Sequence, residues 1–221
     1  MSWMLGRSPV SFHAHTDTIR LTSNATTQKQ FSLLDLCREV TPVCNLNPLL
    51  FNGHLQTFWT VVKGYEVNVY YKRHVFKSVY PSSVGTFAVD FAVPKYEAQD
   101  ASLPPKTTYY VETEFDQVGS DDDRPMLVVL HGLSGGSHEL YLRHVLNPMI
   151  QAGWEACVVN SRGCAKSEIT SGILYNARAT WDVRQTILWL RKKFPNRPLF
   201  GLGFSLGANI LVNVGISQWK G

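Results

Sequence analysis

A serine flanked by two glycines lies near the C-terminal end of the chain, in the segment Gly203-Phe204-Ser205-Leu206-Gly207. It follows a short apolar run, PLFGLGF, and precedes ANILVNV, which suits a helix. A sharp turn between a strand and a helix exposes a serine hydroxyl at the edge of a sheet, and residues without side chains let that turn close. The pattern predicts Ser205 as a nucleophile for acyl transfer, with Gly203 and Gly207 shaping the turn. The alternative is a purely structural glycine turn.

Acyl transfer by a serine also requires a base and hydrogen-bond donors for the oxyanion. The backbone N–H of Leu206 is one candidate donor, because it follows the nucleophile at the positive end of a helix. The second should come from HGLSGG at 131–136, which follows the apolar run MLVVL, and we assign it to the N–H of Leu133. The alternative is a glycine-rich segment that serves only as a tight connection. His131 is expected to be a packed or hydrogen-bonded turn residue rather than the base.

Other chemistries are excluded by spacing. A dinucleotide fingerprint that begins at Gly201 would require glycine at position 206, which is leucine. The chain has no phosphate-binding P-loop, and the pair His138-Glu139 lacks the second histidine of a zinc protease. The four cysteines form neither a CxxC pair nor a cysteine and histidine spacing that suits zinc. We therefore expect no metal and no cofactor.

Composition limits the classes of partner and the cellular compartment that we expect for this chain. The net charge of +4 comes from 21 basic and 17 acidic residues spread along the 221-residue chain, so no nucleic-acid partner is expected. The N-terminus shows no sustained apolar signal segment, and no run of about eighteen apolar residues occurs. We expect an intracellular protein with reduced thiols, either cytoplasmic or peripheral on a lipid surface.

The first half of the chain has weak periodicity. Residues 1–30 are expected to form an irregular N-terminal arm. Residues 67–75 and 85–93 carry β-branched and aromatic residues in near-alternation, which predicts two antiparallel strands. The segment from 94 to 124 contains two adjacent prolines, three consecutive aspartates and one candidate strand, TTYYVETEF. It is therefore expected to be surface loop or insertion rather than core.

The second half alternates strand and helix patterns. MLVVL, an amphipathic stretch from about 139 to 152 and EACVVN predict a strand, a helix and a strand joined by a right-handed crossover. ATWDVRQTILWLRKKF then predicts a second helix before PLFGLGF. Continuous apolar strands of this kind are typical of a mostly parallel sheet covered by helices on both faces. Arg162, which follows EACVVN, is expected to fix a loop through an ion pair.

Four motifs together resemble one family. NPLLFNGHLQT at 47–57, HGLSGGSHELYLRH at 131–144, NSRGCAKS at 160–167 and GFSLGANIL at 203–211 are similar to the AB hydrolase 4 family, which includes lipid esterases, monoacylglycerol lipases and fungal medium-chain acyl-CoA:ethanol acyltransferases. The resemblance covers residues 31 to about 213. It implies a partial α/β-hydrolase domain over residues 31–221. It also implies a fatty acyl ester or acyl-CoA substrate whose acyl group is attached to Ser205, with water or a small alcohol as the acceptor.

The chain departs from the family after about Asn213. In the family's order the catalytic aspartate or glutamate and then the histidine follow the serine, but LGANILVNVGISQWKG contains none of these residues. The triad Asp and His are therefore absent from the chain, and we expect a C-terminal truncation that removes the last strands. Three classes remain open: a serine esterase or acyltransferase recorded incompletely, a non-catalytic protein that binds acyl lipids or a partner, and a half-domain completed by another chain.

Overall fold

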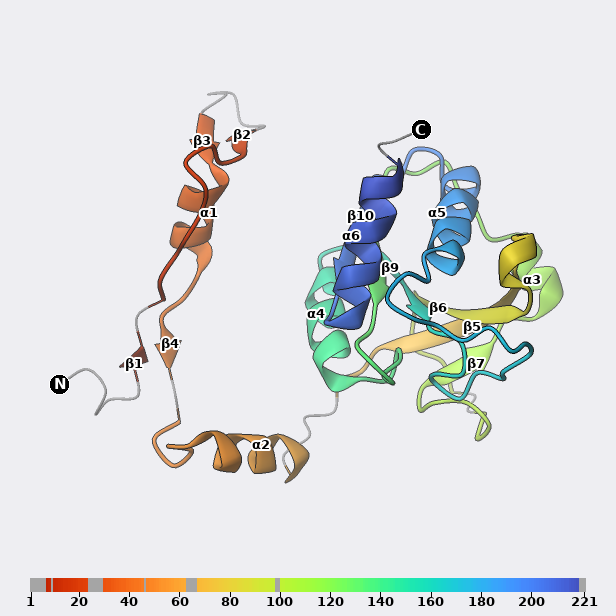
Figure 1. The fold of residues 1–221 in the computed structure, drawn as a ribbon, viewed down its shortest axis with the longest axis horizontal. Helices are drawn as coiled ribbons and strands as arrows, with labels where there is room; N and C mark the ends of the chain where they lie inside the picture. The colour runs from red at the N-terminus through yellow and green to blue at the C-terminus, as the bar shows by residue number, and fades with distance from the viewer. Residues whose placement is uncertain are drawn as a thin grey trace. The chain divides into compact units, whose positions relative to one another are not determined.

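A computed structural model describes residues 7–8, 10–23, 30–45, 47–62, 67–97 and 100–218 (Figure 1). The chain divides into two compact units, Met1–Gly64 and Tyr65–Gly221. This division comes later in the chain than the boundary expected after residue 30, so the assignment of residues 31–64 to the second domain stays a prediction.

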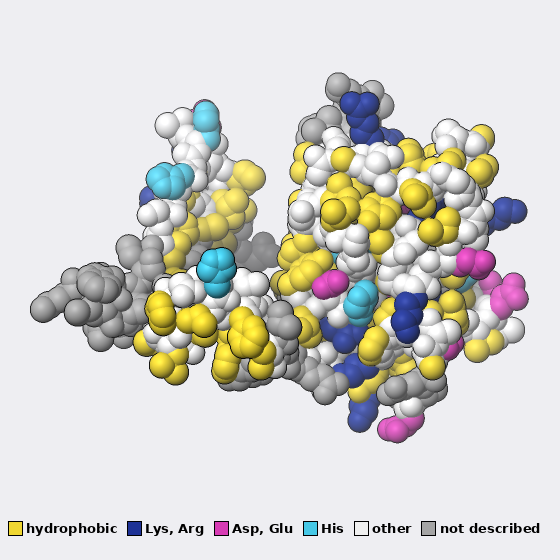
Figure 2. Space-filling view, turned by 60° about the horizontal axis from the view of Figure 1, so that its bottom comes forward, with side chains coloured by type: hydrophobic (Ala, Val, Ile, Leu, Met, Phe, Trp, Pro, Cys, Tyr) yellow, Lys and Arg dark blue, Asp and Glu magenta, His cyan; other side chains and the backbone are white. Residues whose placement is uncertain are grey.

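The first unit consists of short elements. Strand β1 (Arg7–Ser8) pairs with β4 (Cys44–Asn45), and β2 (Arg20–Thr22) pairs with β3 (Gln30–Ser32), both antiparallel. Helices α1 (Leu33–Val40) and α2 (Gly53–Val62) begin at side-chain caps, since Ser32 Oγ accepts the N–H of Asp35 and Asn52 Oδ1 accepts that of Leu55. None of its described side chains is fully buried, and Figure 2 shows hydrophobic side chains on its surface. The strongly exposed apolar residues around α2 are Leu49, Phe51, Phe58 and Val62.

The second unit is built on a six-stranded sheet in the order β10-β8-β9-β6-β5-β7. Strands β10 (Leu199–Gly203), β8 (Met126–Leu130) and β9 (Glu155–Asn160) run parallel to one another. β6 (Thr86–Val93) is antiparallel to β9 and to β5 (Tyr70–Lys77), as the alternating patterns predicted, and β7 (Thr107–Tyr109) is parallel to β5. Three of these five pairings are parallel, which confirms the mostly parallel sheet.

The expectation that the segment from 94 to 124 is surface loop or insertion is partly wrong, because some of its residues belong to the core. β7 adds a strand to the sheet, and helix α3 (Glu112–Asp116) follows it. The ring of Phe115 stacks on Trp189 with centroids 5.1 Å apart, and Leu103 and Thr107 are also buried. These contacts join residues far apart in the sequence, so local composition, with its prolines and aspartates, gave the wrong prediction.

Helices cover both faces of the sheet. The chain leaves β8 through α4 (Leu140–Gln151) to β9, and then returns through α5 (Trp181–Lys193) to β10 on the other side of β8. Because right-handed crossovers in opposite directions place their helices on opposite faces, α4 packs on one face, whereas α5 and α6 (Leu206–Gln218) pack on the other. The loops after β8, β9 and β10 therefore meet at one edge of the sheet, where ligands bind in open α/β sheets.

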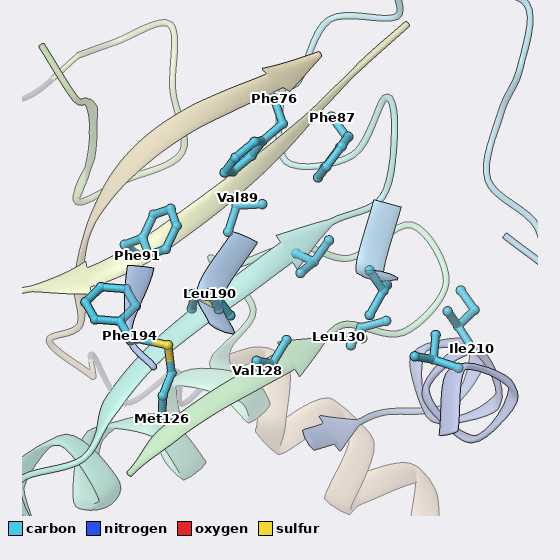
Figure 3. Packing of buried hydrophobic residues seen from close by; sticks show 14 of the residues in the cluster. Phe76, Phe87, Val89, Phe91, Met126, Val128, Leu130, Leu190, Phe194 and Ile210 are labelled. Carbon is cyan, nitrogen blue, oxygen red and sulfur yellow. The ribbon is translucent and has the colours of Figure 1, made fainter. Parts of the chain in front are cut away.

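Alternating residues of the strands supply the two cores. Met126, Val128 and Leu130 face the α5 and α6 side, whereas Leu127 and Val129 face α4. Figure 3 shows the first of these cores, with Leu190 of α5 and Ile210 of α6 against the sheet. The other labelled side chains in that view come from β8, β5, β6 and the residue that follows α5: Met126, Val128, Leu130, Phe76, Phe87, Val89, Phe91 and Phe194. In the described parts of the chain, every helix is too short or too polar to span a lipid bilayer.

Candidate active site

Ser205 lies in the turn between β10 and α6. β10 ends at Gly203, α6 begins at Leu206, and the backbone of Ser205 has φ 51°, in the left-handed region that non-glycine residues seldom adopt. The helix nevertheless starts directly, since the N–H of Ala208 donates to the carbonyl oxygen of Ser205 at 3.0 Å. The serine side chain is exposed to solvent. Strained backbone that presents one exposed hydroxyl is the geometry expected of a nucleophile elbow.

Both flanking glycines are required by close packing. A Cβ atom at Gly203 would lie 2.5 Å from Cα of Ala208 in the first turn of α6. A Cβ atom at Gly207 would lie 2.5 Å from the carbonyl oxygens of Leu130, the last residue of β8, and of His131, which follows it. The elbow therefore rests directly on the backbone of the neighbouring strand.

The loop after β8 lies beside the serine. The Cβ position of Gly132 is 3.6 Å from Cβ of Ser205. The loop then turns back, because the N–H of Gly135 donates to the carbonyl oxygen of Gly132 at 3.2 Å and Ser134 adopts φ 57°. Leu133, at the tip of this turn, is 71% exposed. The structure thus brings together the elbow and the glycine-rich segment that the sequence singled out.

His131 fixes one peptide of this loop. Its Nε2 accepts the N–H of Ser161 at 3.0 Å, so the ring proton resides on Nδ1, which lies 2.6 Å from the carbonyl oxygen of Gly132 and donates to it. Burial lowers the pKa of His131, which keeps this ring neutral. Because the C=O and N–H of a trans peptide point in opposite directions, the Leu133 N–H is directed away from the imidazole. His131 is a buried turn residue with both ring nitrogens engaged.

The two candidate oxyanion donors have free backbone N–H groups. Leu206 is the first residue of α6, and the first N–H groups of a helix have no partner within the helix. Within residues 100–218, neither the Leu206 N–H nor the Leu133 N–H donates to a backbone or side-chain acceptor. Their assignment as the oxyanion hole remains a proposal.

A buried polar network supports the far end of the loop. Asp90 of β6 accepts two bonds from the guanidinium of Arg73, at 2.6 and 2.8 Å, and one from Asn160 Nδ2 at 2.8 Å. Ser137 Oγ donates to the same carboxylate at 2.5 Å, and the Ser137 N–H donates to Asn160 Oδ1 at 3.0 Å. Each of these four side chains is almost completely inaccessible to solvent. The network ties the loop to three strands and would not be recognised from sequence spacing.

Arg162 anchors the loop after β9, which confirms the ion pair expected from the sequence. Its Nε and Nη2 donate to the two carboxylate oxygens of Asp182 at 2.8 and 2.7 Å. The same guanidinium donates to the carbonyl oxygens of Ser83 and Val84. Asp182 lies in the first turn of α5, so Arg162 connects this loop to the segment that precedes β6 and to the helix.

No histidine described in residues 67–97 and 100–218 is hydrogen-bonded to the Ser205 hydroxyl. Within residues 100–218, the Ser205 hydroxyl has no side-chain hydrogen-bond partner, and both nitrogens of His131 are engaged elsewhere. The residues after Ser205 include no Asp, Glu or His. Among the residues that the structure describes, no group of three His, Cys, Asp or Glu side chains is arranged to hold a metal ion.

The chain is similar to known lipid esterases over part of their length. A monoacylglycerol lipase of Saccharomyces cerevisiae is 40% identical over 185 residues, which is 75% of this chain and 40% of that protein. A medium-chain fatty acid ethyl ester synthase/esterase 2 of the same yeast is 30% identical over 197 residues, covering 76% of this chain and 43% of the relative. Among solved structures, a Pyrococcus furiosus esterase has 15% identity and a TM-score of 0.46, covering 72% of this chain and 51% of that one. The chain spans less than half the length of the two yeast relatives.

The match to a family model coincides with the site. Residues 125–215 match the model described as alpha/beta hydrolase fold, a stretch that begins just before β8 and ends within α6. It contains both the glycine-rich loop and the elbow with Ser205. Together with the parallel sheet, this match shows an alpha/beta hydrolase fold, and the similarity to the yeast relatives agrees with the AB hydrolase 4 family.

Proposed function

We propose that the protein is a serine-dependent carboxylic ester hydrolase or acyltransferase that forms an acyl-enzyme on Ser205. The observation that carries this proposal is the elbow itself: an exposed serine with left-handed backbone, packed on the end of β8 beside the Gly132–Leu133 peptide. The yeast relatives support the substrate class, because their names specify a monoacylglycerol and medium-chain fatty acid ethyl esters. Medium-chain fatty acyl esters, either monoacylglycerol or acyl-CoA plus an alcohol, are therefore the proposed substrates.

The reaction proceeds in two acyl transfers. Ser205 Oγ attacks the acyl carbonyl carbon, its proton passes to a base, and the carbonyl oxygen becomes an oxyanion that the N–H groups of Leu133 and Leu206 stabilise. Collapse of this intermediate breaks the bond to the alcohol or thiol, which leaves with a proton. Water or a small alcohol then attacks the acyl-enzyme and restores the serine. The base and its orienting acid belong, in the family pattern, to chain that follows the nucleophile.

The test is Ser205→Ala in the protein expressed from its full transcript. Loss of a triad member typically lowers the rate by several orders of magnitude, so the variant should lose cleavage of p-nitrophenyl octanoate and keep its circular dichroism spectrum. A variant that retains a substantial part of the activity would show that Ser205 is not the nucleophile. A wild-type protein that binds octanoyl-CoA without cleaving it would favour the second candidate, an acyl-lipid or partner-binding protein without turnover. Within residues 100–218, no described side chain accepts the proton of the Ser205 hydroxyl, which is the observation that motivates this candidate.

The acceptor is tested with octanoyl-CoA and ethanol. Water and ethanol compete to attack the same acyl-enzyme, and the extent to which the site excludes water decides which of them reacts. Ethyl octanoate among the products supports the acyltransferase activity. Octanoate alone, even at high ethanol concentration, restricts the proposal to hydrolysis.

The cellular setting is proposed on chemical grounds. The four cysteines, which are all free, favour a reducing intracellular compartment. Acyl substrates of this length partition into lipid, so we place the protein in the cytoplasm or peripherally on a lipid surface. Flotation with phosphatidylcholine vesicles that contain monoacylglycerol distinguishes these two locations.

A further inference from the structure

Tyr141, the second residue of α4, contacts both parts of the candidate active site. Its hydroxyl oxygen accepts the N–H of Gly132 at 3.0 Å. Its ring packs edge-on against the ring of Phe204, with centroids 4.8 Å apart and planes at 64°. Gly132 directly precedes Leu133, and Phe204 directly precedes Ser205. One side chain therefore joins the residue before a candidate oxyanion donor to the residue before the nucleophile.

The glycines of the loop leave the space that the phenol occupies. A Cβ atom at Gly132 would lie 3.5 Å from the Tyr141 hydroxyl, and one at Gly135 would lie 3.1 Å from it. The loop is thus fitted closely around this oxygen. Burial raises the pKa of Tyr141, so the phenol is neutral at ordinary assay pH and accepts the Gly132 N–H as an uncharged oxygen.

The two contacts constrain different groups. The hydroxyl holds the nitrogen of Gly132, while the His131 Nδ1–H holds the carbonyl oxygen of the same residue. Gly132 is therefore fixed at both ends, and with it the direction of the following N–H at Leu133. The ring contact holds Phe204, whose own N–H donates to the carbonyl oxygen of Leu130 at 3.0 Å.

We propose that Tyr141 is a positioning residue that sets the distance between the oxyanion-hole loop and the nucleophile elbow. The inference rests on the proposed function, because the position of the loop matters for catalysis only if Ser205 forms an acyl-enzyme. A small displacement of an oxyanion donor weakens its stabilisation of the transition state. A positioning residue of this kind therefore affects kcat more than it affects substrate binding.

The experiment compares Tyr141→Phe with Tyr96→Phe in the protein expressed from its full transcript. Both changes delete one phenol oxygen that is hydrogen-bonded to backbone. The Tyr96 hydroxyl donates to the carbonyl oxygen of Tyr71 at 2.8 Å, and Tyr71 lies in β5 rather than in the loops around the serine. Tyr141→Phe keeps the ring against Phe204 and should lower kcat for p-nitrophenyl octanoate about tenfold with KM nearly unchanged. Tyr96→Phe should keep the wild-type kcat.

A second measurement does not depend on activity. In nitrogen-15-labelled protein, Tyr141→Phe should speed amide hydrogen exchange at Gly132 about tenfold, the effect of one lost hydrogen bond, and should shift the Leu133 amide resonance. Tyr141→Leu, which also removes the ring, should in addition shift the amides of Phe204 and Ser205. Tyr96→Phe should leave all four amides unchanged.

The outcomes separate the two claims. If Ser205→Ala abolishes activity but Tyr141→Phe has the same kcat as Tyr96→Phe, the positioning role is wrong and the proposed function stands. If Ser205→Ala retains activity, the proposed function fails, and Tyr141 is judged on the amides alone. Unchanged exchange at Gly132 in Tyr141→Phe, or unchanged amides of Phe204 and Ser205 in Tyr141→Leu, would then overturn the inference, whereas the expected changes would support only its structural part, that Tyr141 holds the loop against the elbow.

Discussion

Gly207→Ala separates steric packing at the elbow from helix propensity. Alanine within a helix is favoured over glycine by about 1 kcal/mol. The added methyl group, however, would lie 2.5 Å from the carbonyl oxygens of Leu130 and His131. Extra atoms in a packed site cost about 1–3 kcal/mol. Both obstructing atoms belong to the backbone and cannot move by a change of rotamer, so the cost should lie at the upper end of this range. The expected net effect is destabilisation by about 2 kcal/mol.

Gly215→Ala is the matched control in the same helix. A Cβ atom at Gly215 meets nothing within 4 Å, so only helix propensity acts, and the variant should be more stable by up to about 1 kcal/mol. Urea unfolding followed by tryptophan fluorescence gives both values, as shifts of the midpoint at constant slope. Midpoints that rise in both variants, or a Gly207→Ala protein as stable as the wild type, would refute the close packing of the elbow on β8.

Three further predictions concern stability and association. Burial lowers the pKa of His74 to about 4 in the folded protein. Between about pH 6.5 and pH 4, the His74 side chain is therefore protonated in the unfolded chain but not in the folded protein. The free energy of unfolding should therefore decrease from pH 6.5 towards pH 4, and less so in His74→Phe, which keeps a ring stacked on Phe115; equal pH dependence would contradict this. Phe200→Lys, at the outer edge of β10 where no described strand pairs, should reduce self-association in light scattering, and unchanged particle size would argue against an adhesive edge. Arg162→Met should cost about 3–5 kcal/mol by leaving the Asp182 carboxylate buried and unpaired, and a second change, Asp182→Leu, should recover much of the loss in urea unfolding; no recovery would exclude the buried charge as the cause.

Periodicity predicted the second half of the chain closely. The apolar runs MLVVL and EACVVN are β8 and β9, and the predicted helix from about 139 to 152 is α4. Parallel strands buried on both faces have a continuous apolar pattern, so these strands can be recognised from residues that are adjacent in the sequence. The elbow was equally recognisable, because its two glycines and serine are adjacent in the sequence.

The remaining features depend on contacts between distant residues. Asp90 bonds Ser137 and Asn160, which lie 47 and 70 positions away, and no local pattern signals such a network. Tyr141 lies in the helix predicted from about 139 to 152, but its hydroxyl bond to Gly132 becomes visible only once α4 is docked. Phe115 enters the core by stacking on Trp189, although its own segment is rich in acidic residues.

Labelling with a fluorophosphonate, which reacts only with activated serines, tests the nucleophile most directly. The protein expressed from its full transcript is incubated with the probe, digested, and the modified peptide is located by mass spectrometry, with Ser205→Ala in parallel. The elbow geometry predicts a single adduct on Ser205 and no labelling of the alanine variant. An unlabelled Ser205 in folded protein that cleaves octanoyl esters, or equal labelling of Ser205→Ala, would contradict the assignment of Ser205 as the nucleophile.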